Sequence, residues 1–173
     1  GVLFVDMVGF TGLATSRPAE EMFALLRTFH AMLAREVDAH GGTLDKFTGD
    51  GIMATFGTPV AGSRDAAKAF DCARAIGVAM ARANAARLAA GEPKIRIGVG
   101  LHWGEAMMGT IGDERRIEFA VLGDTVNVAS RLEGLAHRLS AQICASAEAL
   151  EMARAQGADV SGFVDSGAHS LRG

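Results

Sequence analysis

The sequence has few features that would crosslink the chain or place it in a membrane. Its two cysteines, Cys72 and Cys144, provide neither a disulfide framework nor a zinc-ligand spacing. Every apolar run is broken by charges before the roughly 18 residues that a bilayer requires, and no signal-peptide pattern opens the chain. We therefore expect a cytoplasmic domain without membrane contact, on the cytosolic face if the full-length protein is membrane-anchored.

Clusters of basic residues and paired histidines are also missing. The net charge is -3 and the sequence pI is about 5.9, so the chain lacks the electrostatic footprint that binding to a nucleic-acid backbone needs. The five histidines form no pair at i,i+4 and no His-Glu-x-x-His pattern, so a histidine metal site has no support. Nucleic acid is therefore not an expected partner.

What is present indicates an ordinary globular domain. The 173 residues are 49% hydrophobic and 21% charged, which is enough apolar content for one sizeable core. The chain opens directly on an apolar run, "GVLFVD", and stops at "AHSLRG". We expect a single domain, residues 1–173, that is a fragment of a longer chain.

The pattern of apolar residues predicts an α+β fold. Long helices are expected at 18 to 40, at 63 to 90 and after "GDT" at 123 to 125. "VGFTG" reads as a turn, and a short helix is expected near the C-terminal end. Strands are expected at 2 to 6, on both sides of the turn in "TLDKFTGDGIMATFG", and in "KIRIGVGLHWGEAMMG", "RIEFAVLG", "AQICAS" and "ADVSGFVD". The order predicts a ferredoxin-like βαββαβ core with a C-terminal βαβ-type extension.

Two acids stand where predicted strands end. Asp6 follows the first apolar strand, and Asp50 lies between two glycines in the hairpin turn. If the strands are neighbours, the carboxylates repel each other unless they are protonated or bridged by a cation, and a hard divalent metal is the natural bridge. The turn from Gly9 to Gly12 could direct its amides at an anion. By spacing alone this signal is weak, and two aspartates that only cap turns are the simpler interpretation.

Longer motifs favour the first interpretation. "FVDMVGFT", "DKFTGDGIMATFG", "VGLHWGEAMMGTIG" and "EFAVLGDTVNVASRLE" resemble, in order and spacing, the catalytic domain of class III nucleotidyl cyclases, the adenylate and guanylate cyclases. The resemblance covers nearly the whole chain. It implies that Asp6, Asp50 and the carbonyl of Met7 hold two Mg²⁺ ions, with Mn²⁺ as a possible replacement. It also implies that amides of the turn meet the phosphates, at Gly9, Phe10 and Thr11.

The resemblance assigns the catalytic roles to Asn127 and Arg131, which orient the ribose and stabilise charge at the α-phosphate. Their spacing agrees, because residues four apart share one face of a helix. Without the motif, Arg131 would read as a solvated helix arginine and Asn127 as a hydrogen bonder at a helix start.

Recognition of the purine is implied at two positions. Lys46 matches the residue that reads the base, and a lysine there goes with ATP because an ammonium only donates hydrogen bonds. Ala120 occupies the second position, where adenylate cyclases carry aspartate or threonine, and its methyl cannot accept from the amino group of adenine. The family also holds the outer phosphates with a basic residue at the position of Gly98, so Arg96 or Arg172 is expected to substitute.

The resemblance further implies a head-to-tail homodimer with two shared sites, and a regulatory domain in the full-length chain. The expected reaction converts ATP into 3',5'-cyclic AMP and pyrophosphate. A guanylate cyclase and a weakly active or non-catalytic module that binds nucleotide, dimerises and relays a signal are the alternatives. Diguanylate cyclases are disfavoured because the hairpin lacks a Gly-Gly-Asp/Glu-Glu-Phe signature.

Overall fold

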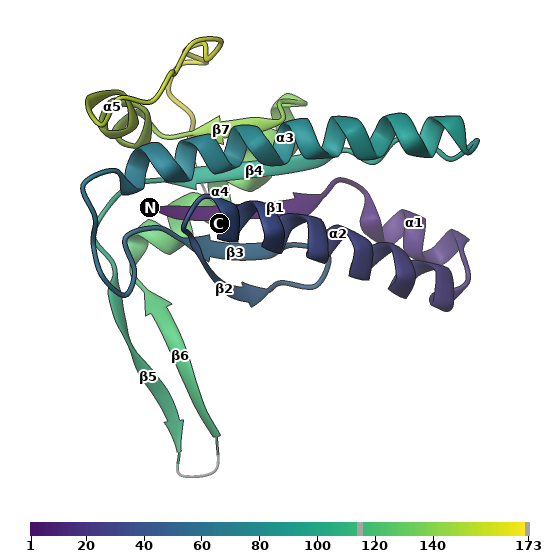
Figure 1. The fold of residues 1–173 in the computed structure, drawn as a ribbon, viewed down its shortest axis with the longest axis horizontal. Coiled ribbons are helices and arrows are strands. Elements are labelled where there is room, and N and C mark those ends of the chain that lie inside the picture. Colours follow the sequence, from purple (N-terminus) through teal and green to yellow (C-terminus); the bar gives the residue numbers. More distant parts are fainter. Residues whose placement is uncertain (114–115, 172–173) are drawn as a thin grey trace.

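A mixed five-stranded sheet forms the centre of the computed structural model, which describes residues 1–113 and 116–171 (Figure 1). The strand order is β2-β3-β1-β4-β7. The strands are β1 (Val2–Met7), β2 (Thr43–Phe47), β3 (Ile52–Thr55), β4 (Ile97–His102) and β7 (Ile143–Ala145). β1 runs antiparallel to both of its neighbours, β3 and β4, while β4 and β7 are parallel.

Helices cover both faces of this sheet. Figure 1 shows α2 (Ala19–Ala39) and α3 (Asp65–Ala89) in front of it and α4 (Asp124–Leu139) behind it. Side chains on β1 alternate between the two faces, as a strand requires. Leu3, Val5 and Met7 join the main core with α2 and α3, whereas Val2 packs in a smaller cluster with Ala129 of α4. By the same alternation, Asp6 lies on the α4 face.

Gly98 and Gly100 of β4 have no side chains, and this allows α4 to lie directly on the strand. A Cβ atom added to Gly100 would stand 2.2 Å from the carbonyl oxygen of Ala129 and 2.3 Å from the amide nitrogen of Glu133. Both atoms belong to the helix backbone and have little freedom to move away. The absence of a side chain at Gly100 therefore determines how closely α4 approaches the sheet. It also determines how far the side chains of α4 lie from the strands.

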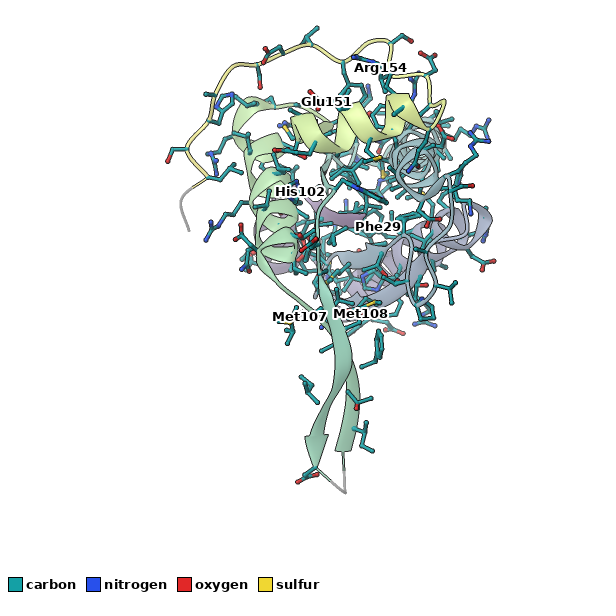
Figure 2. All side chains as sticks on the ribbon, turned by 90° about the vertical axis from the view of Figure 1, so that its left-hand side faces the viewer. Phe29, His102, Met107, Met108, Glu151 and Arg154 are labelled. Atoms are coloured by element: carbon teal, nitrogen blue, oxygen red, sulfur yellow. The ribbon has the colours of Figure 1, made fainter. Side chains whose placement is uncertain are left out.

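A long hairpin extends away from the body of the domain. It consists of β5 (Met107–Asp113) and β6 (Arg116–Leu122) and forms its own two-stranded sheet. Figure 2 shows the hairpin side chains standing clear of the core, with Met107 and Met108 at its base. Met107 and Ile117 are 71% and 72% exposed. Apolar side chains this exposed on a projecting hairpin are typical of a surface that another chain covers.

The expected α+β fold is confirmed, with two local corrections. The segment read as a turn in "VGFTG" instead begins a short helix, α1 (Phe10–Ser16), because Gly9 adopts a φ of 78° and lets the chain bend straight into a helical turn. No strand forms at 158–165, after α5 (Ala147–Ala155). Arg74 donates there to the carbonyl oxygens of Asp159 and Ser161 at 2.8 and 3.3 Å, so a side chain takes the place of a strand partner.

Both cysteines are free thiols, and Cys72 is buried while Cys144 is half-buried. Within the described ranges, no helix has the length and apolarity that crossing a membrane would take.

The contact between α4 and β4 predicts a strong effect of Gly100→Ala. The added methyl must push the helix backbone away, and overpacking of this kind costs about 2 to 3 kcal/mol, so the melting temperature should fall by about 5 to 10 °C. Thermal unfolding followed by circular dichroism measures this. Gly134→Ala in the same helix is the control, since the atom that an added Cβ would meet among the described residues outside the helix backbone is the end of Arg138, at 3.9 Å. Equal stability of Gly100→Ala and wild type would contradict the close approach.

Candidate active site

The two predicted acids, Asp6 and Asp50, converge on the α4 face of the sheet. Asp6 precedes the last residue of β1, and Asp50 lies in the turn between β2 and β3. Gly49 has a φ of 77°, and a Cβ atom on Gly51 would stand 2.1 Å from the carbonyl oxygen of Val5 and 2.8 Å from Oδ1 of Asp6. The glycines on both sides of Asp50 therefore let this turn press against the end of β1.

The electrostatics of the pair show how close the acids are. The pKa of Asp6 is raised from 3.8 to about 7, first by burial and then by the charge of Asp50 and a hydrogen bond with its side chain. Burial and the charge of Asp50 likewise raise the pKa of Glu133, on α4, to about 7. Three carboxyl groups thus share one region of high negative potential.

This donor set fits a hard divalent cation. Carboxylate and carbonyl oxygens are the ligands that Mg²⁺ prefers, and a cation would relieve the repulsion that raises the pKa of Asp6. Among the described residues, no three His, Cys, Asp or Glu side chains are grouped as a complete metal site. The oxygen donors that could hold such a cation are the carboxylates of Asp6 and Asp50 and the carbonyl of Met7, which would leave positions for water or substrate oxygens.

The predicted phosphate-binding turn is the first turn of α1. Helix starts leave amides without intrahelical partners, and here those amides follow β1 directly, at Phe10 and Thr11. Gly9 is the left-handed residue before them. A hollow of about 350 Å³ lies between α1 and the segment from Pro93 to Ile95. Lys94 lines this hollow, so it is a basic residue near the turn that the sequence motifs did not single out.

Of the two arginines expected to replace a phosphate-binding residue, one can be placed. Arg96 is exposed just before β4, and its carbonyl oxygen accepts from the Val8 amide at 2.9 Å, so it stands beside the turn. Its charge also lowers the pKa of His137, after the larger effect of burial. Arg172 lies outside the described residues.

Two residues of α4, Glu133 and His137, occupy the space over Gly98. A Cβ atom on Gly98 would stand 2.3 Å from Cδ2 of His137 and 3.0 Å from Oε1 of Glu133. Nε2 of His137 lies 2.7 Å from that Glu133 oxygen. Gly98 is paired with Asp6 across β1 and β4, so both side chains adjoin the acid pair. Their i,i+4 spacing was a signal for one shared helix face, but only the fold reveals what that face covers.

Asn127 and Arg131 are both exposed on α4 and do not join the acids of their own chain. Successive helix residues are about 100° apart, so Arg131 and Glu133 point in directions about 200° apart. Because Glu133 faces the sheet beside Asp6, Arg131 faces away from it. One chain therefore supplies the acids and the arginine on opposite sides of α4.

The two positions expected to read the purine differ in exposure. Lys46 is 39% exposed, and its Nζ lies 3.3 Å from Oδ2 of Asp45. Ala120, on β6, is only 3% exposed in the single chain, so its methyl presents almost no surface. His30 packs against Phe47 at the end of β2 with ring centroids 4.6 Å apart, which supports the strand just before the Asp50 turn.

The fold and the paired acids place the chain among nucleotidyl cyclase catalytic domains. It belongs to the family described as "Adenylate and Guanylate cyclase catalytic domain", whose profile matches residues 1–173. Adenylate cyclase 1 of Rhizobium meliloti (strain 1021) is 38% identical over 144 residues, which are 83% of this chain and 22% of that protein. The chain thus spans about a fifth of the length of this relative.

Solved structures similar to this chain include cyclases of both purine specificities. The guanylyl cyclase Cya2 has a TM-score of 0.80 and 32% identity, covering 88% of this chain and 76% of its own. The adenylyl cyclase CyaB from P. aeruginosa has a TM-score of 0.80 and 31% identity, covering 89% of this chain and 79% of its own.

The raised pKa of Asp6 predicts how stability depends on pH without metal. Its folded pKa of about 7 exceeds the ordinary 3.8, so the folded chain binds more protons and the free energy of unfolding falls as pH rises from about 4 to 7. Asp6→Asn should remove this loss and, allowing for solvent screening of a half-buried group, be about 1 to 2 kcal/mol more stable than wild type at pH 8 in chelator.

Thermal unfolding at pH 5 and pH 8, with chelator or with Mg²⁺, measures this difference. Mg²⁺ should stabilise the wild type at pH 8 and have much less effect on Asp6→Asn. The exposed Asp38→Asn is the control and should behave as wild type. A stability difference between Asp6→Asn and wild type that is the same at pH 5 and pH 8 in chelator would contradict the raised pKa of Asp6.

Proposed function

We propose that this domain is an adenylate cyclase that converts ATP into 3',5'-cyclic AMP and pyrophosphate. The observation that carries the proposal is the convergence of Asp6 and Asp50 beside the start of α1. The repulsion between the two carboxylates favours binding of a cation between them. In the reaction, the ribose 3'-oxygen forms a bond to the α-phosphorus and gives up its proton. The bond between the α-phosphorus and the bridging oxygen breaks, and pyrophosphate leaves with the electron pair.

The acids and the start of α1 would receive the triphosphate. Asp6, Asp50 and the Met7 carbonyl would hold two Mg²⁺ ions, or Mn²⁺ in their place. When bound, these cations would lower the pKa of the 3'-hydroxyl and neutralise the phosphates. The amides of Phe10 and Thr11, after Gly9, would donate to phosphate oxygens. Arg96 stands beside this turn and would contact the outer phosphates, the role also expected of Arg172.

A second copy of the chain would complete the site. Arg131 faces away from the acids of its own chain, so its guanidinium would reach the α-phosphate held by a partner, and Asn127 on the same face would orient the ribose. The exposed apolar side chains of the β5–β6 hairpin offer a surface for that partner. A head-to-tail homodimer with twofold symmetry would contain two equivalent sites.

Lys46 supports ATP as the substrate. Its ammonium can donate to the ring nitrogen N1 of adenine, whereas N1 of guanine carries a hydrogen and needs an acceptor. Ala120 supplies no acceptor for the amino group of adenine, so discrimination would rest on Lys46 and the backbone. Guanylate cyclase activity is the second candidate, because Ala120 departs from the adenylate pattern and a guanylyl cyclase is among the similar structures.

Product analysis tests the reaction directly. Purified protein incubated with ATP or GTP and Mg²⁺ or Mn²⁺ should form cyclic AMP from ATP, identified by chromatography and mass spectrometry. Asp50→Asn should lower the rate by about 10³-fold or more, because the loss of one charge weakens the electrostatic stabilisation of the phosphates. Asp38→Asn is the control with unchanged activity. Preferential formation of cyclic GMP would make the domain a guanylate cyclase, and no cyclic product would contradict the enzyme.

Mixing two inactive variants tests the shared site. Asp50→Ala and Arg131→Ala should each be inactive alone but recover activity together, because a mixed dimer keeps both intact groups in one of its two sites. With random exchange, half the dimers are mixed, so about a quarter of wild-type activity is expected. Activity is measured after the variants exchange subunits, with mixed dimers confirmed by native mass spectrometry. No recovery in confirmed mixed dimers would refute the shared arrangement.

A further inference from the structure

An irregularity in the β2–β3 pairing determines where Lys46 points. Leu44 pairs with Ala54 and Lys46 pairs with Met53, so the register shifts at Asp45. Ala54 belongs to the core beneath α2 and α3, whereas Met53 belongs to the cluster on the α4 face. On a regular strand, residues two apart share a face, and Lys46 would follow Leu44. The extra residue turns Lys46 onto the face that also carries Asp6.

Asp45, the residue at the register shift, also contacts the Lys46 side chain. The Asp45 side chain is only 3% exposed, and its Oδ2 lies 3.3 Å from Nζ of Lys46, which is itself 39% exposed. That buried oxygen has no hydrogen-bond partner within the described ranges. A carboxylate removed from water in this way is unfavourable unless a cation stands near it. The ammonium is therefore held on one side by a fixed charge, while part of the lysine stays open to solvent.

The Lys46 side chain stays 39% exposed beside Asp45, so a ligand can approach it from solvent. An ammonium carries three donor hydrogens, and Oδ2 of the Asp45 carboxylate attracts it by charge at 3.3 Å without accepting a hydrogen bond from it. A long lysine chain normally samples many rotamers and loses that freedom when it binds. Because Asp45 already restrains the side chain, less freedom remains to be lost, and the ammonium would meet a base from a narrower range of directions. The ability of the ammonium to distinguish N1 of adenine, an acceptor, from N1 of guanine, a donor, depends on the direction of its approach.

We propose that Asp45 is a positioning residue that holds the Lys46 ammonium where it reads N1 of the purine, and that Asp45 thereby sets the preference for ATP over GTP. The inference rests on the proposed function, since it gives Lys46 its base-reading role. It adds a residue that acts through Lys46 and does not itself touch the nucleotide. A purely structural Asp45 would stabilise the bulge and affect both nucleotides equally.

The test compares wild type, Asp45→Asn, Lys46→Met and the double variant. For each purified dimer, kcat/KM is measured with ATP and with GTP, and the Kd is measured by calorimetry for 3'-deoxy-ATP and 3'-deoxy-GTP, which lack the attacking hydroxyl. Asp45→Asn should lower the ATP-to-GTP ratio of kcat/KM by about tenfold, mostly through a higher KM for ATP. The double variant should have the same ratio as Lys46→Met, because Asp45 acts through the lysine.

Asp65→Asn is the matched control. Asp65 is also a buried acid beside a lysine, with its Oδ1 3.7 Å from Nζ of Lys68 and its side chain 6% exposed, but it lies on α3. This variant should lower the melting temperature and leave the nucleotide ratio unchanged. It separates a loss of stability from a loss of discrimination.

Several results would overturn the inference. One is an Asp45→Asn ratio within twofold of wild type, with both nucleotides affected equally. Another is a double variant with a clearly lower ratio than Lys46→Met, because Asp45 would then act without the lysine. If the wild type forms no cyclic product, the proposed function fails, and the Kd ratio for the 3'-deoxy nucleotides decides the role of Asp45 alone. A ratio that falls in Asp45→Asn supports it, and an unchanged ratio refutes it.

Discussion

The repulsion between the carboxylates of Asp6 and Asp50 is the constraint on which the rest of the structure depends. The chain brings them together although burial and like charge oppose it, and it does so with small residues: Gly51 lets the β2–β3 turn touch the end of β1. A fold that concentrates negative charge in this way is less stable than one that separates the acids. Under the proposed function, a bound cation and a polyphosphate would offset this cost.

Helix α4 also depends on glycines for its position beside the acid pair. Gly98 and Gly100 remove the side chains that would hold it off β4, so Glu133 and His137 reach the neighbourhood of Asp6. The same close contact turns Arg131 outward. Under the proposed function, one helix would therefore support the acids of its own chain and present Asn127 and Arg131 to a second copy. This division would explain how a sequence motif of a few residues, "NVASRLE", combines groups that point to opposite sides of α4.

Much of the fold follows from local signals, and the errors arise where long-range contacts decide. The helices at 18 to 40 and 63 to 90 and the hairpin around Asp50 were predicted because apolar spacing and glycine punctuation are local properties. The seven residues of α1 are too few to show a helical period, and the segment at 158–165 looked like a strand until Arg74 bound its carbonyls. Glu133 and the bulge at Asp45 were not foreseen, because both depend on which strand or helix lies opposite. The sequence predicts the meeting of Asp6 and Asp50 only if their strands are neighbours, and the pairing of β1 with β3 meets that condition.

The projecting hairpin has a mechanical consequence. Each of its strands has seven residues, so the arm is about 23 Å long at about 3.3 Å per residue. A tilt of about 10° at its base then displaces its far end, at Asp113, by about 4 Å, which exceeds the length of a hydrogen bond of about 3 Å. A small rotation of the domain therefore moves the far end of the hairpin by a large distance. In the proposed dimer, the distance between the two copies and the alignment of their reactive groups would then change together.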